Sequence, residues 1–347
     1  MKLLHKKIIY YIVALFCIVS CKKDTEEVQK DDFSILSGNG VFVLNEGNFQ
    51  WGNASVSFYK YSDGSVISDI FFEANNRPLG DVAQSISIFQ DKLYIVVNNS
   101  GKIEVINPVD FKSEGIIAGL TSPRYFIGLS TNKAYISDLN ANYITIVDLT
   151  TLQKSGHIDC YGSTEEMILY NDKVYVSNTR KSYIYIIDPS TDLIIDSILT
   201  AYAPNSMVID KNGKLWVISM GNYTPEIYGC LQRINVIDKN IELSLPFNKP
   251  LNIWDKLRIN NTKDTLYFFN DGVCKMSIYS TSLPQNAFIN QGNKLFYGLA
   301  VEPTTGNIYV SDAIDYVQKG TVFIYSPAGY LLKSFKAGII PSTFCFY

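Results

Sequence analysis

The chain has 347 residues and a formal charge of −3, from 30 basic and 33 acidic side chains. This near balance, with no basic face in the sequence, argues against a nucleic-acid partner bound by electrostatic attraction. The only histidines are His5 and His157, so a histidine-rich zinc site is excluded and a Ser-His-Asp triad would depend on His157.

The N-terminal segment has the features of a secretory signal. Lysines precede an apolar run over residues 8–19, which is too short to span a bilayer. Small residues before Cys21 resemble a bacterial lipobox, in which Cys21 becomes the lipidated N-terminus; an ordinary cleaved signal is the alternative. We therefore predict a lipoprotein signal peptide over residues 1–20 and a flexible polar tether over 21–37, with a lipid anchor in place of a transmembrane span.

The tether also indicates a location. Its early acidic residues, Asp24, Glu26 and Glu27, resemble the signal that sends Bacteroidetes lipoproteins to the outer face of the outer membrane. The sequence therefore predicts a protein that is lipid-anchored in the outer membrane and exposed on the cell surface, with no other contact with the membrane.

A short apolar segment recurs seven times at intervals of 40 to 52 residues. Each copy has an aromatic second residue and ends on a small or polar one. A period near 40 with four strand-like pieces per repeat is typical of a β-propeller, so we predict an all-β, seven-bladed propeller over residues 38–347. The copies are Val41–Asn45, Leu93–Asn98, Ala134–Asp138, Val174–Asn178, Leu215–Ser219, Leu266–Asn270 and Ile308–Asp312.

The two ends of the repeat region predict how the ring closes. In the repeat over residues 122–160, strands are expected at 123–129, 133–138, 144–148 and 154–158, separated by turns rich in Asn and Thr. The first recurring segment has the pattern of a second strand, whereas residues 338–347 have that of a first strand with no second strand after it. We therefore expect the C-terminal strand to complete the first blade.

Long loops indicate the binding face. They follow the second strand in repeats one, five and seven, and a long segment leads into repeat six. In a propeller these loops share one face, which is the usual binding surface, and their amides and aromatics suit a large polar ligand. The predicted ligand-contact residues are Asn45, Glu46, Trp51, Arg77, Asn98, Arg124, Tyr125, Asp138, Asn178, Asn222, Tyr223, Trp254, Asp312 and Tyr316.

Several of these residues have a structural alternative. Asn98, Asp138 and Asn178 end second strands, where Asn and Asp often only form turns. Arg124 could be a surface charge. Trp51, Tyr223 and Tyr316 stand in loops too long for tight turns, which favours a contact role.

The sequence offers carboxylates without a matched nucleophile and base. The pairs Glu165-Glu166 and Asp312/Asp315 could ligate a cation or act as acid and base, but a solvated or turn role is favoured. We predict no catalytic residue, no metal and no cofactor. The remaining cysteines have no CxxC spacing; their pairing cannot be read from the sequence, and we expect mostly free, buried thiols. They are Cys160, Cys230, Cys274 and Cys345.

A further set of motifs lies in residues 43–49, 79–85, 97–103, 122–126, 296–300 and 309–313. These motifs together resemble the YncE-like propeller lipoproteins of Bacteroidetes, whose best understood members are the BtuG-type cobalamin-capturing proteins. The resemblance covers roughly residues 38–347. It implies a seven-bladed propeller that binds a corrinoid at the cell surface and passes it to a TonB-dependent outer-membrane transporter, with cobalamin as cargo rather than cofactor.

Other functions fit the same architecture. A glycan- or peptide-binding lipoprotein would use Trp51, Tyr223 and Trp254 as stacking platforms. A metal-dependent propeller lyase or lactonase would need inward side chains from several blades to converge at one point. A module that only docks on a transporter is a further alternative. The side chains that the enzyme would bring together are Glu46, Asp138, Asn178 and Asp312.

Overall fold

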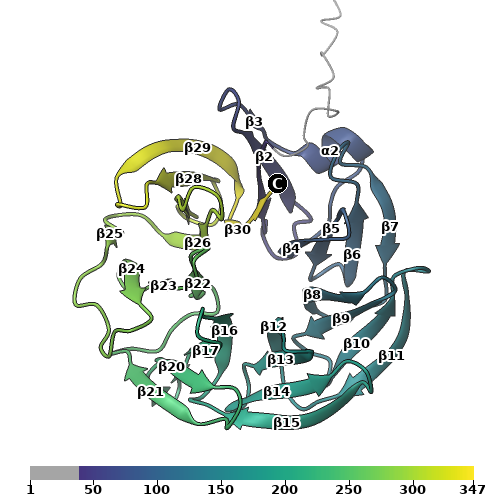
Figure 1. The fold of residues 1–347 in the computed structure, drawn as a ribbon. Coiled ribbons are helices and arrows are strands. Elements are labelled where there is room, and N and C mark those ends of the chain that lie inside the picture. The colour runs from purple at the N-terminus through teal and green to yellow at the C-terminus, as the bar shows by residue number, and fades with distance from the viewer. Residues whose placement is uncertain (1–38) are drawn as a thin grey trace, which may run out of the picture. The chain divides into compact units, whose positions relative to one another are not determined.

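The computed structural model describes residues 39–347. The predicted signal peptide, the whole of the predicted tether and the lipidation site Cys21 lie outside the described residues. Residues 39–347 form seven four-stranded antiparallel sheets, and Figure 1 shows them arranged as blades around a common centre. The predicted seven-bladed β-propeller is confirmed.

The first three blades follow one pattern, with the innermost strand written first. Blade 1 contains β30 (Pro341–Phe346), β1 (Gly40–Asn45), β2 (Ser55–Lys60) and β3 (Val66–Ile67). Blade 2 contains β4 (Ala83–Phe89), β5 (Lys92–Val97), β6 (Lys102–Ile106) and β7 (Ser113–Ile117). Blade 3 contains β8 (Pro123–Ser130), β9 (Lys133–Asp138), β10 (Tyr143–Asp148) and β11 (Gln153–Asp159).

The remaining four blades continue around the ring. Blade 4 contains β12 (Thr164–Tyr170), β13 (Lys173–Asn178), β14 (Tyr183–Asp188) and β15 (Leu193–Leu199). Blade 5 contains β16 (Pro204–Ile209), β17 (Lys214–Ser219), β20 (Cys230–Asn235) and β21 (Ile241–Pro246). Blade 6 contains β22 (Arg258–Ile259), β23 (Thr265–Phe269), β24 (Gly272–Ser277) and β25 (Ile289–Asn290). Blade 7 contains β26 (Phe296–Val301), β27 (Ile308–Asp312), β28 (Lys319–Tyr325) and β29 (Leu331–Ile339).

The recurring segment of the sequence is the second strand of each blade. These strands are rich in β-branched and aromatic residues and buried along almost their whole length, because both of their faces pack against neighbouring blades. The outer strand β11 is almost entirely exposed by contrast, and it carries His157 as expected. The position of a strand within its blade therefore decides whether it is buried on both faces, as the second strand is, or largely exposed, as the outer strand is.

The C-terminal strand completes the first blade, as predicted. β30 runs antiparallel to β1, with Val41 opposite Phe346 and Asn45 opposite Pro341. Figure 1 shows this yellow strand beside the purple β1 and β2. The two ends of the propeller chain thus share one sheet, which leaves no open junction in the ring.

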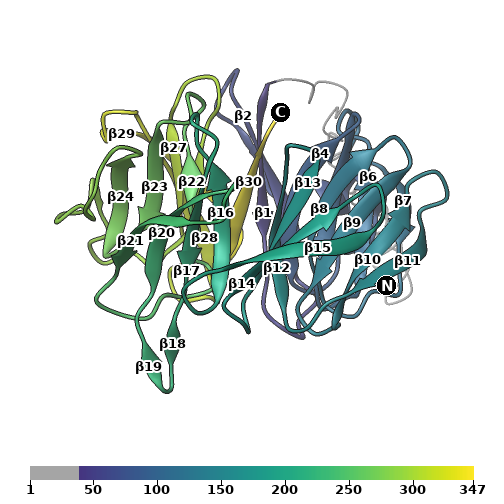
Figure 2. The ribbon, with the colours of Figure 1, turned by 60° about the horizontal axis from the view of Figure 1, so that its bottom comes forward.

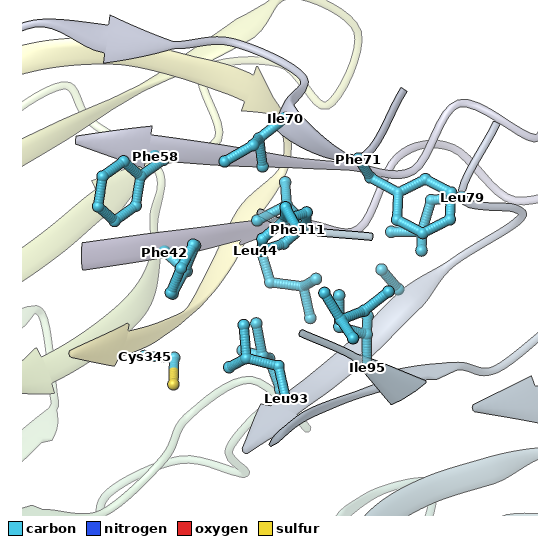
Figure 3. Close-up of a cluster of buried hydrophobic side chains, with 14 of the residues drawn as sticks. Phe42, Leu44, Phe58, Ile70, Phe71, Leu79, Leu93, Ile95, Phe111 and Cys345 are labelled. Carbon is cyan, nitrogen blue, oxygen red and sulfur yellow. The ribbon is translucent and has the colours of Figure 1, made fainter. Parts of the chain in front are cut away.

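Apolar side chains fill the space between neighbouring blades. Between blades 1 and 2, the ring of Phe42 packs on Phe58 and Phe111 with centroids 4.7 and 5.1 Å apart. Figure 3 shows the cluster of buried side chains to which these rings belong. Cys345 closes the same cluster. The four cysteines of the described region are all free and buried, which confirms the expectation, and burial raises the pKa of Cys345 to about 12.

Two elements were not anticipated from the sequence. Helix α2 (Ile70–Asn75) lies between β3 and blade 2, begins at the N-cap Asp69 and buries Ile70 and Phe71. The long loop of repeat five forms a hairpin from β18 (Asn222–Tyr223) and β19 (Glu226–Ile227), which projects beyond the blades in Figure 2. Both elements have six or fewer residues, which is too short for a periodic pattern. Within residues 39–347, no helix has the length and apolar character needed to cross a membrane.

Candidate functional site

A repeated irregularity of the innermost strands builds the centre of the loop face. In six blades the pairing between first and second strand skips a residue near the start of the first strand, which is a β-bulge. A bulge re-aims the side chains that it carries. The residues at the bulges are Gln84, Arg124, Tyr125, Glu165, Glu166, Asn205, Tyr297, Gly298 and Ser342.

Serines of the second strands hold these bulges in place. The backbone N–H of Tyr125 donates to Ser137 Oγ at 3.0 Å, and that of Gly298 donates to Ser311 Oγ at 2.7 Å. In blade 4, Ser177 Oγ donates to the carbonyl oxygen of Glu166 at 3.3 Å. The bulged backbone is therefore satisfied without a ladder partner.

The bulge residues line a central cavity of about 300 Å³. Gln84, Arg124, Tyr125 and Tyr297 contribute to its wall, together with Lys256 and other residues of the segment that leads into β22. This volume is at the lower end of the range for small-molecule pockets. The cavity can therefore hold one group of a large ligand, with the remainder on the face above it.

A buried ion pair crosses from blade 3 to blade 4 beside the cavity. Arg124 Nε donates to Glu165 Oε1 at 2.7 Å, and Arg124 Nη1 also donates to Gln84 Oε1. Burial by itself lowers the pKa of Arg124, but the neighbouring Glu165 outweighs it and raises that pKa. Glu165 Oε2 is buried and has no hydrogen-bond partner among the described residues.

A second ion pair links blade 6 to blade 4. Arg258 Nη1 lies 3.1 Å from Glu166 Oε1, and Glu166 Oε2 accepts hydrogen bonds from Ser206 Oγ at 2.8 Å and Met207 N at 3.0 Å. Arg258 also donates through Nε to the Leu299 carbonyl oxygen at 3.2 Å. Because these partners come from four blades, the pair fixes the geometry of the cavity floor.

Glu46 has an unusual proton affinity. It follows β1 in the first long loop and accepts a hydrogen bond from Tyr297 Oη at 2.8 Å. Burial raises the pKa of Glu46 to about 7, although the hydrogen bond from Tyr297 and the charges of Arg124 and Lys256 act in the opposite direction. Glu46 is therefore close to half-protonated at neutral pH.

Aromatic rings form the rest of the cavity wall. Trp254 stacks on Tyr297 with centroids 5.2 Å apart and an angle of 21° between the planes. Tyr316 meets Tyr297 edge-on at 6.0 Å. On the other side, the Lys256 ammonium lies 5.5 Å above the ring of Tyr125. These flat surfaces can accept a planar or apolar part of a ligand.

A second cavity of about 310 Å³ adjoins the first one, with Trp254 in both walls. Tyr223 closes its outer side, and the Tyr223 hydroxyl donates to Asn252 Oδ1 at 3.1 Å. Asp255 is buried beneath it and accepts from the Asn252 backbone N–H at 2.6 Å, and burial raises the pKa of Asp255 to about 6. A ligand that spans Trp254 would contact both cavities.

Five of the predicted contact residues are bonded to the scaffold. Each ends the second strand of its blade or, in the case of Asn98, directly follows it, and its amide or carboxylate bonds to neighbouring backbone or hydroxyl groups. Asp138 accepts from the N–H groups of Ser122, Asn140 and Ala141, and it is 2% exposed. These contacts favour the structural alternative for Asn98, Asp138 and Asn178, and Asn45 and Asp312 have bonds of the same kind.

Arg77 is also a scaffold residue. Its guanidinium forms two hydrogen bonds to the buried carboxylate of Glu104, at 2.7 and 2.8 Å, and lies over the ring of Phe71. Glu104 belongs to the third strand of blade 2, away from the inner strands that line the cavities. The prediction that Arg77 contacts the ligand does not fit this position.

The other predicted residues divide between the cavities and their surroundings. Glu46, Arg124, Tyr125 and Trp254 line the central cavity, and Tyr223 lines the second one. Tyr316 packs edge-on against Tyr297, which lines the central cavity. The loop residue Trp51 is 73% exposed, and Asn222 bonds to its own hairpin through Thr224; neither lines a cavity described here.

Sequence reasoning missed several residues of the central cavity. A signal for three of them was present, because Gln84, Tyr297 and Ser342 occupy the same bulge position as Arg124 in their own repeats. Aligning the first strands of the repeats would have found them. Lys256 and Arg258 lie outside this pattern, since their blade has a two-residue first strand.

The enzyme alternative required converging carboxylates and amides. Asp138, Asn178 and Asp312 are instead each bound to their own loops, while Glu46 alone reaches the cavity. Residues 39–347 contain no group of three or more His, Cys, Asp and Glu that could hold a metal ion. The cavity therefore has one of these four side chains in its wall, together with the polar and aromatic groups described above.

Solved structures share this fold at low sequence identity. A quinonprotein alcohol dehydrogenase-like protein of Bacteroides thetaiotaomicron is 16% identical, with a TM-score of 0.69 over 90% of this chain and 78% of that chain. The hydrazine synthase of Kuenenia stuttgartiensis is 15% identical, with a TM-score of 0.57 over 75% of this chain and 88% of that chain. These similarities support the propeller fold.

Sequence comparison identifies a related antigen and a family. Antigen Lp49 of Leptospira interrogans is 24% identical over 213 residues, which are 58% of this chain and 44% of that protein. The chain thus spans less than half the length of this curated relative. The family described as "Domain of unknown function (DUF5074)" matches residues 39–336, nearly the whole propeller. The chain therefore belongs to the DUF5074 family of β-propeller proteins.

Proposed function

We propose that this protein captures a large polar small molecule on its loop face and that the ligand is a corrinoid. The observation that carries the proposal is the pair of adjoining cavities that share Trp254. A corrinoid combines a broad ring, peripheral amides and a nucleotide arm, which calls for several separate polar contacts. Two cavities joined by an aromatic wall offer such contacts within a preformed surface, which lowers the ordering cost of binding.

The experiment is a titration of the purified protein with cyanocobalamin, followed by tryptophan fluorescence and by calorimetry. We expect saturable one-to-one binding. Trp254→Ala should weaken it about tenfold or more, because Trp254 borders both cavities. Trp51→Ala is the matched control, since Trp51 is 73% exposed and lines neither cavity. Absence of binding at micromolar ligand would reject the corrinoid.

A glycan is the second candidate, and one observation favours it. The second cavity is lined by Asn252, Asn270 and Gln291 together with the aromatic residues Tyr223 and Trp254. Asn270 Oδ1 is buried and has no hydrogen-bond partner among the described residues. Amides beside aromatic rings suit the hydroxyl groups and flat faces of sugars. Binding of an oligosaccharide panel, lost in Tyr223→Ala while cyanocobalamin fails to bind, would favour this candidate.

The place of the protein in the cell belongs to the same proposal. Lipidation at Cys21 would hold the propeller at the outer membrane, where a TonB-dependent transporter could receive the ligand. Fractionation of cells and mass spectrometry of the N-terminal peptide would test the anchor. Recovery of the protein in the periplasmic fraction without a lipid would reject it. Co-purification of a TonB-dependent transporter from detergent-solubilised membranes would test the partner.

We infer binding without chemical change of the ligand. The arginines beside the central cavity are held in ion pairs with Glu165 and Glu166. His157 lies on the outer strand β11. These groups can position a ligand but offer no free nucleophile and base pair. Recovery of intact cyanocobalamin by mass spectrometry after prolonged incubation would support binding alone, and a modified product would overturn this inference.

A further inference from the structure

Some charged side chains around the central cavity form ion pairs within the described part of the chain, and others do not. Four of them form the pairs Arg124–Glu165 and Arg258–Glu166, whose N–O distances are 2.7 and 3.1 Å. Lys256 and Glu46 also line this cavity. Neither forms an ion pair within 4.0 Å with another described residue. This lysine and this carboxyl group are therefore the charged groups of the cavity that remain available to a ligand.

Lys256 is held in position with donors to spare. Its Nζ donates to Asn205 Oδ1 at 2.7 Å and lies 5.5 Å above the ring of Tyr125. An ammonium group has three N–H donors, so this contact leaves two of them. The side chain is only partly exposed, and a charge in such surroundings is less screened than one on the open surface. Lys256 is thus a fixed cation that faces the cavity.

Glu46 decides the net charge beside Lys256. With Glu46 ionised, the cavity has three carboxylates against the three cations Arg124, Lys256 and Arg258, and it is balanced. With Glu46 protonated, one positive charge is in excess. Burial raises the pKa of Glu46 to about 7, so this change falls at neutral pH.

Groups from several elements surround Glu46 and affect its titration. Arg124 from β8 and Lys256 from the segment before β22 act as positive charges, while Tyr297 from β26 donates its hydroxyl. Tyr316 is the remaining titratable neighbour, from the loop after β27. Burial raises the pKa of both tyrosines, which leaves Glu46 as the group that changes charge near neutrality.

We propose that the central cavity binds one anionic oxygen group of the ligand, a carboxylate or a phosphodiester, on Lys256, and that it does so with Glu46 protonated. The inference rests on the proposed role of this cavity as a ligand site. A protonated Glu46 accepts the Tyr297 hydrogen bond and can donate its own proton to the anion, whereas an ionised Glu46 repels it. Proton uptake and anion binding are therefore coupled.

Matched small probes test the charge rule without knowledge of the natural ligand. Benzoate and benzamide have nearly the same shape, and both can stack on Trp254, but only benzoate is an anion. Methyl phenyl phosphate supplies a phosphodiester of the same charge. Binding of each probe to the purified protein would be followed by tryptophan fluorescence between pH 6 and pH 8. Whichever anion binds more tightly identifies the source of the oxygen group.

We expect at least one anion to bind at pH 6 and to bind at least about fivefold more weakly at pH 8. Glu46→Gln should remove this pH dependence, and Lys256→Met should abolish anion binding at both pH values. Lys92→Met is the matched control, because Lys92 is paired with Glu114 at 2.8 Å and lines neither cavity. Benzamide binding as tight as benzoate binding, no binding of either anion at pH 6, or unchanged binding by Lys256→Met would overturn the inference.

Cyanocobalamin separates this inference from the proposed function. If cyanocobalamin fails to bind while the anion probes follow the expected pattern, the corrinoid is wrong and the anion subsite stands. If cyanocobalamin binds equally well to the wild type and to Lys256→Met while the anions fail, the corrinoid stands and the subsite is wrong.

Discussion

At the scale of single residues, side chains of one type have two separate roles in this protein. Asp138 ends a second strand and Glu46 follows one, but Asp138 accepts hydrogen bonds from three backbone N–H groups, two of them in its own loop, while Glu46 reaches the central cavity. A polar side chain at the end of a strand therefore stabilises the scaffold when backbone N–H groups lie within hydrogen-bonding distance of it. It is available to a ligand when a long loop carries it away from such groups.

Glu46 gives a prediction on stability and pH. Because its pKa is raised from 4.5 to about 7 in the folded protein, the folded state binds more protons than the unfolded state between these values. Stability should therefore fall as the pH rises through this window, with a slope of at most about 1.4 kcal/mol per pH unit. Glu46→Gln should flatten the curve, as measured by urea unfolding at several pH values.

The window from pH 6 to pH 7 is the informative part of that measurement. Asp255 also has a raised pKa, of about 6, and contributes a loss of stability with the same sign at lower pH. Asp255→Asn is therefore the matched control, because it should flatten the curve below pH 6 and leave the slope above it. Identical pH curves for the wild type and Glu46→Gln would contradict the prediction.

Arg124 gives a second prediction at this scale. Arg124→Met should destabilise the protein by about 3–5 kcal/mol, because it leaves the fully buried carboxylate of Glu165 without its partner. The double variant Arg124→Met/Glu165→Gln should recover much of this loss, since no unpaired charge remains. Chemical unfolding of the three proteins measures the effect. Equal stability of the single and double variants would show that the unpaired charge of Glu165 is not the cause of the loss.

At the scale of elements, the β-bulges connect the fold to the site. A regular ladder would place alternate residues of each first strand on the two faces of the blade. The bulges at the start of β8 and β12 place two residues opposite one instead, and these residues are Arg124 with Tyr125 and Glu165 with Glu166. The same irregularity in neighbouring blades gathers polar side chains around the centre without loss of the apolar packing further out.

The β18–β19 hairpin gives a prediction at the element scale. Replacing residues 222–228 by a short glycine-rich turn, with Gly221 and Gly229 retained, should change the free energy of unfolding by less than about 1 kcal/mol, because most of its side chains are exposed. It should weaken binding of any ligand that uses the second cavity, whose wall includes Tyr223. Thermal unfolding and ligand titration measure the two effects separately. A large loss of stability would mean that the hairpin is part of the scaffold.

At the scale of the whole molecule, closure of the ring by both ends of the propeller sets its cooperativity. Blade 1 takes three strands from residues 40–67 and its innermost strand from residues 341–346. The blades can pack on both sides only when this sheet is complete. Strand β1 therefore depends on a partner strand that follows it by almost 300 residues, so completion of this sheet is a long-range step in folding.

Deletion of residues 341–347 should prevent the ring from closing. The edge of β1 would lose its partner, and the apolar side chains around Phe42 would be exposed to solvent. We expect loss of the cooperative thermal transition and of near-UV circular dichroism. Deletion of Tyr347 alone is the control, because it removes one residue and leaves β30 intact. A cooperative transition near the wild-type temperature after the longer deletion would contradict the closure argument.

Much of the fold could be predicted from the sequence because it depends on short-range patterns. The seven recurring segments, the four strands of blade 3 and the closing role of the last residues all follow from alternation and turn chemistry. The same patterns placed Glu46, Arg124, Tyr125 and Trp254 on the loop face, and these residues line the central cavity. The sequence by itself therefore determined the architecture and the face of the propeller on which the central cavity lies.

Only the tertiary structure decided which polar residues remain for a ligand. Asn178 and Arg77 are hydrogen-bonded to Tyr161 and Glu104, whereas Lys256 and Tyr297, which the linear pattern did not single out, reach the central cavity. The physical reason is that a hydrogen bond or an ion pair depends on partners from other blades. Those partners are brought within reach when the ring closes, so burial and pairing are properties of the assembled propeller.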